Sequence, residues 1–406
     1  MMVYVKQYPR GSLVDAKGMV LIVALLILAA LVLLGTMAVM MSTTDMKISA
    51  NYKTGNQAFY VAEAGIEEAI ARMRENFAPT TGATGRIDDA DPTNPAWSVS
   101  IGGAGPYTST QSILSYTVLI VHQKNSANQI LYWGDVNGDG VSERTTNPIG
   151  ATGMANKNIY LATSSGVAAN ANKRIVVEMT KVPPITAPAA LYVEALTTIQ
   201  GTSTSVIGLD QCGGANMPGI VTTLTADTIN KTGNPTVSGL TSSTWSVVGG
   251  AANMDIQAVI NEQKGSANFS YNVSGATHTG MAWGTPTMGA TLQNPSSCST
   301  TNVVYYNTSG ADIKLAGGTS GCGLLLVEGD LEINGDFSWY GVVIVTGAVR
   351  FLGGGNKNIT GAVLAGDSVD ADIVGGNANI VYCSTAIRNQ TESQPLRRLS
   401  WKDQSI

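Results

Sequence analysis

A long uncharged stretch near the N-terminus dominates the polarity pattern of the chain. Between Gly18 and Thr44 the sequence contains no Asp, Glu, Lys, Arg or His, and most positions are aliphatic. Leu, Ala and Met favour helix, and about 20 such residues cross the roughly 30 Å hydrocarbon core of a bilayer. Three basic residues and one acidic residue precede the run, which predicts a single membrane-spanning helix with a cytoplasmic N-terminus.

The helical pattern continues beyond the apolar run, to about residue 77. Phe59, Ala62, Ile66 and Met73 recur at helical spacing and form one apolar face, while charged side chains occupy the other face. Pro79 and the Thr-Thr-Gly sequence behind it end the helix. We therefore expect a transmembrane and stalk helix over residues 19–77.

Short β-branched or alternating runs follow and are typical of strands. They cover residues 97–101, 113–121, 130–133, 159–163 and 174–180. Because the connections between neighbours are short, antiparallel pairing is favoured. The sequence thus predicts an α+β lobe over residues 78–182, with the long helix packed on an antiparallel sheet.

A proline-rich segment and a glycine period organise the second half. Three prolines within residues 182–188 predict a stiff linker at 183–189, followed by a second β-rich lobe at 190–386 and a polar tail at 387–406. Glycine recurs every six residues, with short apolar strands between, at Gly329, Gly335, Gly341, Gly347 and Gly353. This period predicts a β-solenoid or β-roll, with an antiparallel meander as the alternative.

The composition is that of an exported β-rich protein. Only 13% of the 406 residues are charged, the net charge is −5, and 46 residues are glycine. The length suits two lobes outside the cytoplasm plus a stalk helix. No cluster of Lys and Arg spans a duplex footprint, which argues against nucleic-acid binding.

Four cysteines, all on the exported side of the apolar helix, predict two disulfides. They are Cys212, Cys298, Cys322 and Cys383. An even number in an oxidising compartment favours disulfides, with the pairing open among three possibilities. Metal ligation is disfavoured because no two cysteines are close in sequence, and His122 and His278 fall in different lobes.

The strongest chemical motif is a D-x-N-x-D-G loop in the first lobe. Asp135, Asn137 and Asp139 present oxygen ligands, the Val141 carbonyl can add another, and Glu143 can ligate directly or through water. Hard oxygen donors suit Ca²⁺, so a structural Ca²⁺ site is expected. The alternative is a hairpin turn that uses Asp, Asn and Gly for backbone reasons alone. A second acidic group, Asp88, Asp89 and Asp91, is expected to be a solvated loop.

No catalytic motif emerges from the sequence. G-x-S-x-G, H-E-x-x-H and P-loop patterns are missing. The carboxylate candidates of the second lobe are Asp330, Asp336, Asp367, Asp370 and Asp372, of which the first two follow a corner glycine, as turn residues do. The sequence therefore predicts a protein without enzymatic activity, with a polysaccharide-processing β-helix protein as an alternative.

The N-terminal region resembles PilX-type minor pilins of type IV pili. A basic leader, Gly18, Met19 and an unbroken apolar helix are similar to a prepilin signal, and the stretch Ala58-Phe-Tyr-Val-Ala-Glu-Ala64 is similar to the run in PilX-type helices. The resemblance covers about residues 17–75 and implies cleavage by prepilin peptidase between Gly18 and Met19, after a leader of residues 1–18. The fifth residue of the mature chain is Val23, where major pilins carry a Glu, and this argues for a minor or tip position.

The resemblance also implies partners and a location. The helix inserts in the inner membrane and then packs against other pilins and minor pilins, so that the chain reaches the cell-surface pilus, in a structural and adhesive role in biogenesis, attachment or motility. A tip adhesin or a surface glycan is the expected partner of the second lobe. A pseudopilin of a type II secretion filament is the alternative that uses the same helix.

Overall fold

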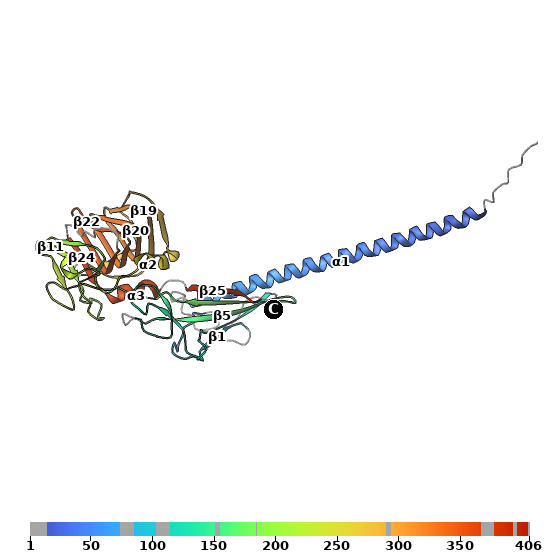
Figure 1. The fold of residues 1–406 in the computed structure, drawn as a ribbon, viewed down its shortest axis with the longest axis horizontal. Coiled ribbons are helices and arrows are strands. Elements are labelled where there is room, and N and C mark those ends of the chain that lie inside the picture. Colours follow the sequence, from blue (N-terminus) through green and yellow to red (C-terminus); the bar gives the residue numbers. More distant parts are fainter. Residues whose placement is uncertain are drawn as a thin grey trace, which may run out of the picture.

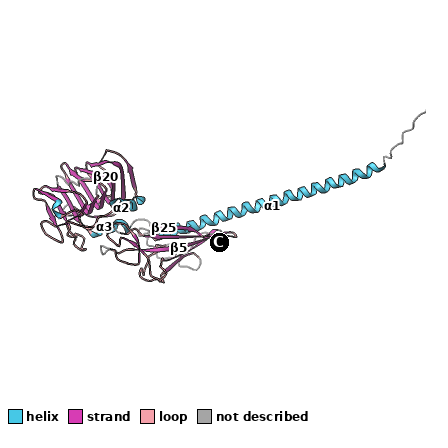
Figure 2. Cartoon of the chain, in the orientation of Figure 1, coloured by secondary structure: helices cyan, strands magenta, loops and turns pink. Residues whose placement is uncertain are grey.

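The computed structural model describes residues 14–73, 85–102, 114–150, 155–183, 185–289, 294–366, 377–392 and 396–404. A long helix, α1 (Val14–Arg72), projects as a stalk from a body made of two β-rich lobes (Figures 1 and 2). The α+β class predicted from the sequence is therefore confirmed. The predicted end of the helix at residue 77 and Pro79 lie outside the described residues.

The first lobe is the antiparallel sheet that the strand pattern predicts. Its strands run in the order β1-β2-β5-β6-β25, with β3 and β4 attached beside β5. Their bounds are β1 (Ser98–Ile101), β2 (Leu114–His122), β3 (Tyr132–Gly134), β4 (Glu143–Thr145), β5 (Lys157–Ala168), β6 (Ala171–Thr180) and β25 (Arg397–Asp403).

The C-terminal part of α1 packs on this sheet through its predicted apolar face. Ala62, Ile66 and Met73 are buried there, together with Ile120 and Val177 of the strands. The helix comes so close to β5 that a Cβ on Gly166 would fall within 3.0 Å of the helix backbone. A glycine on the strand is therefore what lets the helix and the sheet meet.

The prediction of a polar tail over residues 387–406 is wrong for the second half of that segment. Residues Arg397–Asp403 form β25, which pairs antiparallel with β6 and returns the chain to the first lobe. The second lobe is thus an insertion between two neighbouring strands of the antiparallel sheet, β6 and β25. β25 was not predictable from hydrophobicity, because it is an exposed edge strand held by polar contacts such as Ser400 Oγ to Glu178 Oε2 at 2.8 Å.

The second lobe is a parallel solenoid, so the antiparallel alternative is wrong. Its main path runs β12-β9-β24-β23-β21-β20-β19-β14, and every one of these neighbours pairs in parallel. The bounds are β7 (Leu191–Val193), β9 (Ser205–Ile207), β10 (Ile220–Thr222), β12 (Thr236–Ser238), β13 (Val247–Val248), β14 (Phe269–Asn272), β15 (Ala276–Thr279), β16 (Ala282–Trp283), β19 (Asn302–Ala316), β20 (Thr319–Asn334), β21 (Phe337–Val345), β22 (Val349–Leu352), β23 (Asn356–Ala365) and β24 (Asn377–Tyr382).

The six-residue glycine period has a simple geometric meaning. Leu324 pairs with Val342, and 342 minus 324 is 18, which is three times the six-residue spacing. One turn of this part of the solenoid therefore has three sides of about six residues, with glycines at its corners. Gly323, Gly341 and Gly361 lie in one column at φ +120°, +139° and +137°, a region open to glycine.

Smaller elements complete the second lobe. Two short helices belong to this lobe: α2 (Ile256–Gln263), and α3 (Ser384–Glu392), which packs beside β21 and β23. The described residues between 264 and 300 contain five short strands, of which β14, β15 and β16 extend the parallel sheet. The remaining pairs are β8 (Thr197–Gln200) with β11 (Ile229–Thr232), and β17 (Pro286–Met288) with β18 (Pro295–Cys298); 3-10 turns cover Ala226–Thr228 and Lys264–Ser266.

Candidate functional site

The N-terminal part of α1 is an apolar surface without any cover from the described protein. Every residue from Met19 to Lys53 is exposed, and the large apolar side chains among them include Leu28 at 63% and Met41 at 72% exposure. The helix is long and apolar enough to cross a membrane by length and composition. Burying such a surface, in lipid or against other helices, is strongly favourable.

The predicted processing residues lie at the start of this helix. Gly18 and Met19 both fall within α1, and residues 1–13 of the predicted leader are outside the described residues. Val23, which replaces the Glu of major pilins, is exposed on the apolar helix. Cleavage between Gly18 and Met19 stays a prediction.

The D-x-N-x-D-G loop is a hairpin between β3 and β4. Gly134 pairs with Glu143 across the two strands, and Asp135 receives the backbone N–H groups of Gly138 at 2.7 Å and Gly140 at 2.9 Å. Asp139 accepts from the backbone N–H of Val141 at 2.8 Å. These are the backbone uses that the hairpin interpretation requires.

The same loop also joins the two lobes. The Asp139 carbonyl accepts from the Asp255 N–H at 2.9 Å, and Thr186 Oγ1 of the linker donates to Asp135 Oδ2 at 3.1 Å. A Cβ on Gly140 would collide with the side chains of Met254 and Val259 of the second lobe. The predicted Ca²⁺ loop therefore lies in the interface between the lobes. Most described residues of the predicted linker are buried, and Ile185, Ala187 and Ala189 pack in the core of the second lobe.

Glu262 of α2 completes this interface. Its Oε1 accepts from Trp133 Nε1 at 3.1 Å and from Arg397 Nη1 at 2.7 Å, and its Oε2 accepts from Ser142 Oγ at 3.1 Å. The carboxylate is 10% exposed, so these charge-assisted bonds are shielded from water. One side chain of the second lobe thus binds three separate elements of the first.

The Asp135 carboxylate can still accept a further partner, such as an ion. An ionised carboxylate offers about four lone-pair sites, and the three donors to Asp135 leave it at least one. Asp135, Asp139 and Glu143 do not gather their oxygens within 4.8 Å of one another in the described chain. Ca²⁺ held by Asp135, Asn137, Asp139, Val141 and Glu143 would therefore draw the loop together.

We expect Ca²⁺ to stabilise the protein through this loop. At about 100 times the dissociation constant, a ligand specific for the folded state adds about 2.7 kcal/mol to the free energy of unfolding. The measurement is the melting temperature in Ca²⁺ and in EDTA, for the native chain and for Asp139→Asn. This variant can still accept the Val141 N–H, but it loses the charge and the acceptor for Asn137 Nδ2. Equal melting temperatures of the native chain in both buffers would reject a Ca²⁺ site.

The structure resolves the open cysteine pairing. Cys212 bonds with Cys383, and Cys298 bonds with Cys322. All four pack with Tyr340 and Ala386 in one cluster on the outside of the solenoid. Asp210 lies beside the first disulfide, in a group of three potential metal ligands within the described residues, but a disulfide offers no thiolate to a metal.

The predicted solvated acidic loop is wrong for Asp89. This carboxylate is 9% exposed and accepts from Tyr160 at 2.9 Å, and its Oδ2 lies 2.8 Å from His122 Nε2. His122 is itself buried, stacked on Trp97, with its Nδ1 2.9 Å from the Asn94 carbonyl. The sequence does not indicate the contact between Asp89 and His122, because the two residues are 33 positions apart.

Because of the hydrogen bonds to Asp89, we expect the folded protein to lose stability in acid. Burial alone raises the pKa of Asp89, but the hydrogen bonds from His122 and Tyr160 outweigh it, so the pKa lies below its ordinary value. A carboxyl whose pKa is lower when folded stabilises the protein above the unfolded pKa, near 3.9, and loses that effect as the pH falls through the folded pKa.

We therefore expect Asp89→Asn to cost roughly 2–3 kcal/mol at pH 7, where the native carboxylate is ionised. Its unfolding free energy should fall less steeply than that of the native chain below about pH 4. Urea unfolding between pH 3 and pH 7 measures both effects, with the exposed Asp91→Asn as the matched control. Parallel pH profiles for the native chain and Asp89→Asn would contradict this assignment.

These features define a class: an α+β protein with an exposed apolar helix, an antiparallel sheet on its far end, and an inserted solenoid. Residues 17–67 match the family model described as PilX N-terminal, so the resemblance of this segment to PilX-type minor pilins is confirmed. No curated protein matches the chain. Among solved structures it is similar to the competence-associated pilin ComZ from Thermus thermophilus, at 13% identity and a TM-score of 0.22, over 86% of this chain and 97% of that chain.

Proposed function

We propose that the chain is a minor pilin, assembled into or at the tip of a type IV pilus. The observation that carries the proposal is the exposed apolar stretch from Met19 to Met41, directly within the segment that matches the PilX N-terminal model. A surface of this kind needs lipid before assembly and other helices afterwards. Val23 in place of a buried Glu favours a low-copy or tip position over the repeating shaft.

The proposal includes the route to the filament. The chain enters the inner membrane with its N-terminus in the cytoplasm, prepilin peptidase cuts between Gly18 and Met19, and other pilins pack on the helix. The solenoid is then displayed outside, in a structural and adhesive role, toward a tip adhesin or a surface glycan. The contacts through Asp139 and Glu262 support this, because they join the solenoid firmly to the pilin-like lobe.

The test is recovery of the chain in sheared surface filaments. We expect it in the sheared fraction of cells with intact pili and its loss from that fraction when the major pilin is deleted. Dependence on the type II secretion pseudopilin instead would favour the secretion filament. Retention of all of the protein in the inner membrane would contradict both filament readings.

A membrane-anchored polysaccharide-processing protein is the second alternative, and it rests on the parallel solenoid alone. Asp330 and Asp336, its described carboxylate candidates, bind corner backbone N–H groups, of Ala348 and Asn356, at 2.9 and 2.8 Å. Carboxylate contacts of this kind with backbone N–H groups are typical of turns. Turnover of a polysaccharide by the purified chain, lost on substitution of carboxylates, would favour this alternative over the structural role.

A further inference from the structure

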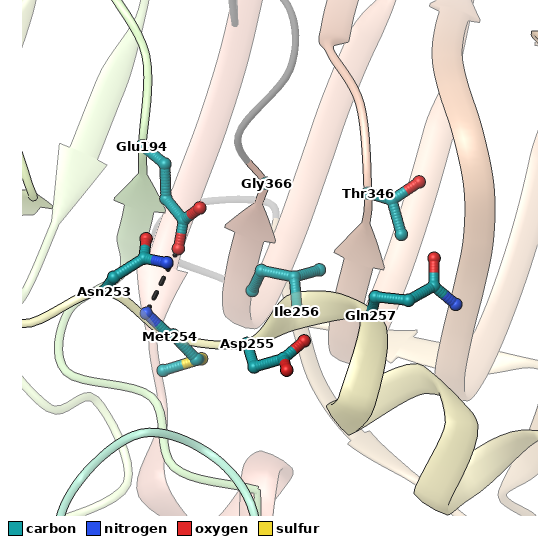
Figure 3. Close-up of a pocket in the computed structure, with 8 residues that line it drawn as sticks. All are labelled: Glu194, Asn253, Met254, Asp255, Ile256, Gln257, Thr346 and Gly366. Atoms are coloured by element: carbon teal, nitrogen blue, oxygen red, sulfur yellow. Dashed lines mark hydrogen bonds between the residues drawn. The ribbon is translucent and has the colours of Figure 1, made fainter.

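Three parallel strands of the solenoid end side by side and leave a cavity. Val193 of β7 and Val345 of β21 both pair with Ala365 of β23, so the residues that follow them stand in one row. These are Glu194, Thr346 and Gly366, which Figure 3 shows at the ends of neighbouring strands. The chain turns away at these strand ends and leaves the cavity between them and the residues that lead into α2.

The start of α2 closes the other side of this cavity. Asn253, Met254, Asp255 and Gln257 face the row of strand ends across a space of about 480 Å³ (Figure 3). That volume lies within the range of small-molecule pockets, about 300–1,000 Å³. Ile256, the first residue of α2, completes the lining.

The polar groups of the cavity are held in place by their neighbours. Glu194 is 8% exposed, and its Oε1 accepts from Tyr192 at 2.7 Å and from the Met254 N–H at 3.2 Å. With its amide oriented so that nitrogen meets carboxylate, Asn253 donates to both Glu194 oxygens, at 2.8 and 3.0 Å. This arrangement points the Asn253 carbonyl oxygen away from the Glu194 carboxylate, so that it can accept from a ligand.

Two further acceptors stand at the mouth. Asp255 uses Oδ1 to cap α2 through the Ala258 N–H at 2.8 Å, which leaves Oδ2 as the oxygen not engaged within the described chain. Gln257 donates its Nε2 to Glu328 at 2.9 Å, so its amide is fixed with the carbonyl oxygen available. Thr346 adds a hydroxyl. The cavity thus presents several fixed oxygens and no lining Lys or Arg among the described residues.

We propose that this cavity binds a neutral saccharide. Two carboxylates repel anions, whereas the hydroxyl groups of a sugar are donors that match carboxylate and amide oxygens, each of which can accept from neighbouring hydroxyls. The polar lining disfavours an apolar ligand, which could not satisfy these buried groups. The biological meaning of this saccharide site rests on the adhesive part of the proposed function. Binding of a saccharide itself does not require a filament.

The test uses the full chain in lauryldimethylamine oxide, because a glycoside detergent would itself compete. Saturation-transfer NMR and calorimetry would probe glucose, galactose, mannose and N-acetylglucosamine. The variants are Glu194→Gln and Asp255→Asn, which keep their acceptor and cap, and Gln257→Ala. The matched control is Asp227→Asn, an exposed aspartate elsewhere on the solenoid.

We expect at least one sugar to bind, with affinity reduced about tenfold or more in each cavity variant and unchanged in Asp227→Asn. Asp255→Asn and Gln257→Ala each lose an acceptor, and Glu194→Gln weakens the carboxylate contact that orients Asn253. Circular dichroism confirms that each variant is folded. Binding of none of the four sugars, or equal binding by the cavity variants, would overturn the proposal. So would stabilisation by CaCl₂ alone that Asp255→Asn removes, because the cavity would then be a cation site. Filament incorporation is measured separately, so a chain that reaches sheared pili without binding sugar refutes only the saccharide site.

Discussion

Replacement of Gly361 by alanine is expected to destabilise the solenoid by roughly 2–6 kcal/mol. Gly361 has φ +137°, a conformation that side chains strongly disfavour, and strain of this kind costs about 1–3 kcal/mol. Its Cβ would also fall within 3.0 Å of the Gly341 carbonyl on the next turn, and such overpacking costs about another 1–3 kcal/mol. Urea unfolding followed by near-UV circular dichroism of the buried Trp339 and Trp283 measures the loss.

Gly354→Ala is the matched control for this prediction. It lies in the turn just before the same strand, β23, but a Cβ there meets no atom within 4 Å and its φ is not positive. We expect this substitution to leave the unfolding free energy within about 0.5 kcal/mol of the native value. If Gly361→Ala were as mild as Gly354→Ala, the stacked glycine column would not hold the turns together.

Removal of the Cys212–Cys383 disulfide is expected to cost more than removal of Cys298–Cys322. The two bridges close segments of 171 and 24 residues, for which the chain-entropy model predicts losses of roughly 5 and 3.5 kcal/mol. The first also joins the start of the solenoid to the segment that leads into α3 and β25. Its loss therefore frees a much longer piece of unfolded chain.

The two double Cys→Ala variants are well matched, because each pair contains one buried and one half-buried cysteine of the same cluster. The burial change is therefore similar, and the difference of roughly 1.5 kcal/mol reflects loop length. Thermal and urea unfolding of both variants measure it. A larger loss for Cys298/Cys322 would show that local packing around Tyr340, and not chain entropy, decides the effect.

The elements predicted best from the sequence are those with a strong period. The uncharged run from Gly18 to Thr44 predicts the helix because an unbroken apolar stretch has few other stable structures. The six-residue glycine spacing predicts a solenoid because most of its positions, all except Gly347, have positive φ, which few other residues adopt. Both patterns are local and repeated, so they can be recognised without any knowledge of tertiary contacts.

The elements missed depend on partners that are distant in sequence. β25 is polar and becomes a strand only because β6 offers its edge, more than 200 positions earlier. The interface between the lobes centres on Glu262, whose partners Trp133, Ser142 and Arg397 come from three separate segments. Lys357 is fully buried, with its Nζ donating to the Gly353 carbonyl at 2.6 Å, although a lysine in isolation predicts a surface position.

The cavity beside α2 shows the same limit. Glu194, Thr346 and Gly366 are up to 172 positions apart, since 366 minus 194 is 172, and only the parallel register of β7, β23 and β21 sets them in a row. Each residue alone looks like the end of a short strand. The D-x-N-x-D-G motif, in contrast, is visible because all of its residues lie in one loop.

The proposed function requires that the uncharged helix first anchors the chain in the membrane and then packs against other helices in a filament. Mass analysis of the N-terminus of this chain, taken from sheared filaments, tests that claim most directly. The account predicts a mature chain that begins at Met19, without residues 1–18. A chain that keeps residues 1–18 and stays in the inner membrane of cells with active prepilin peptidase would contradict it.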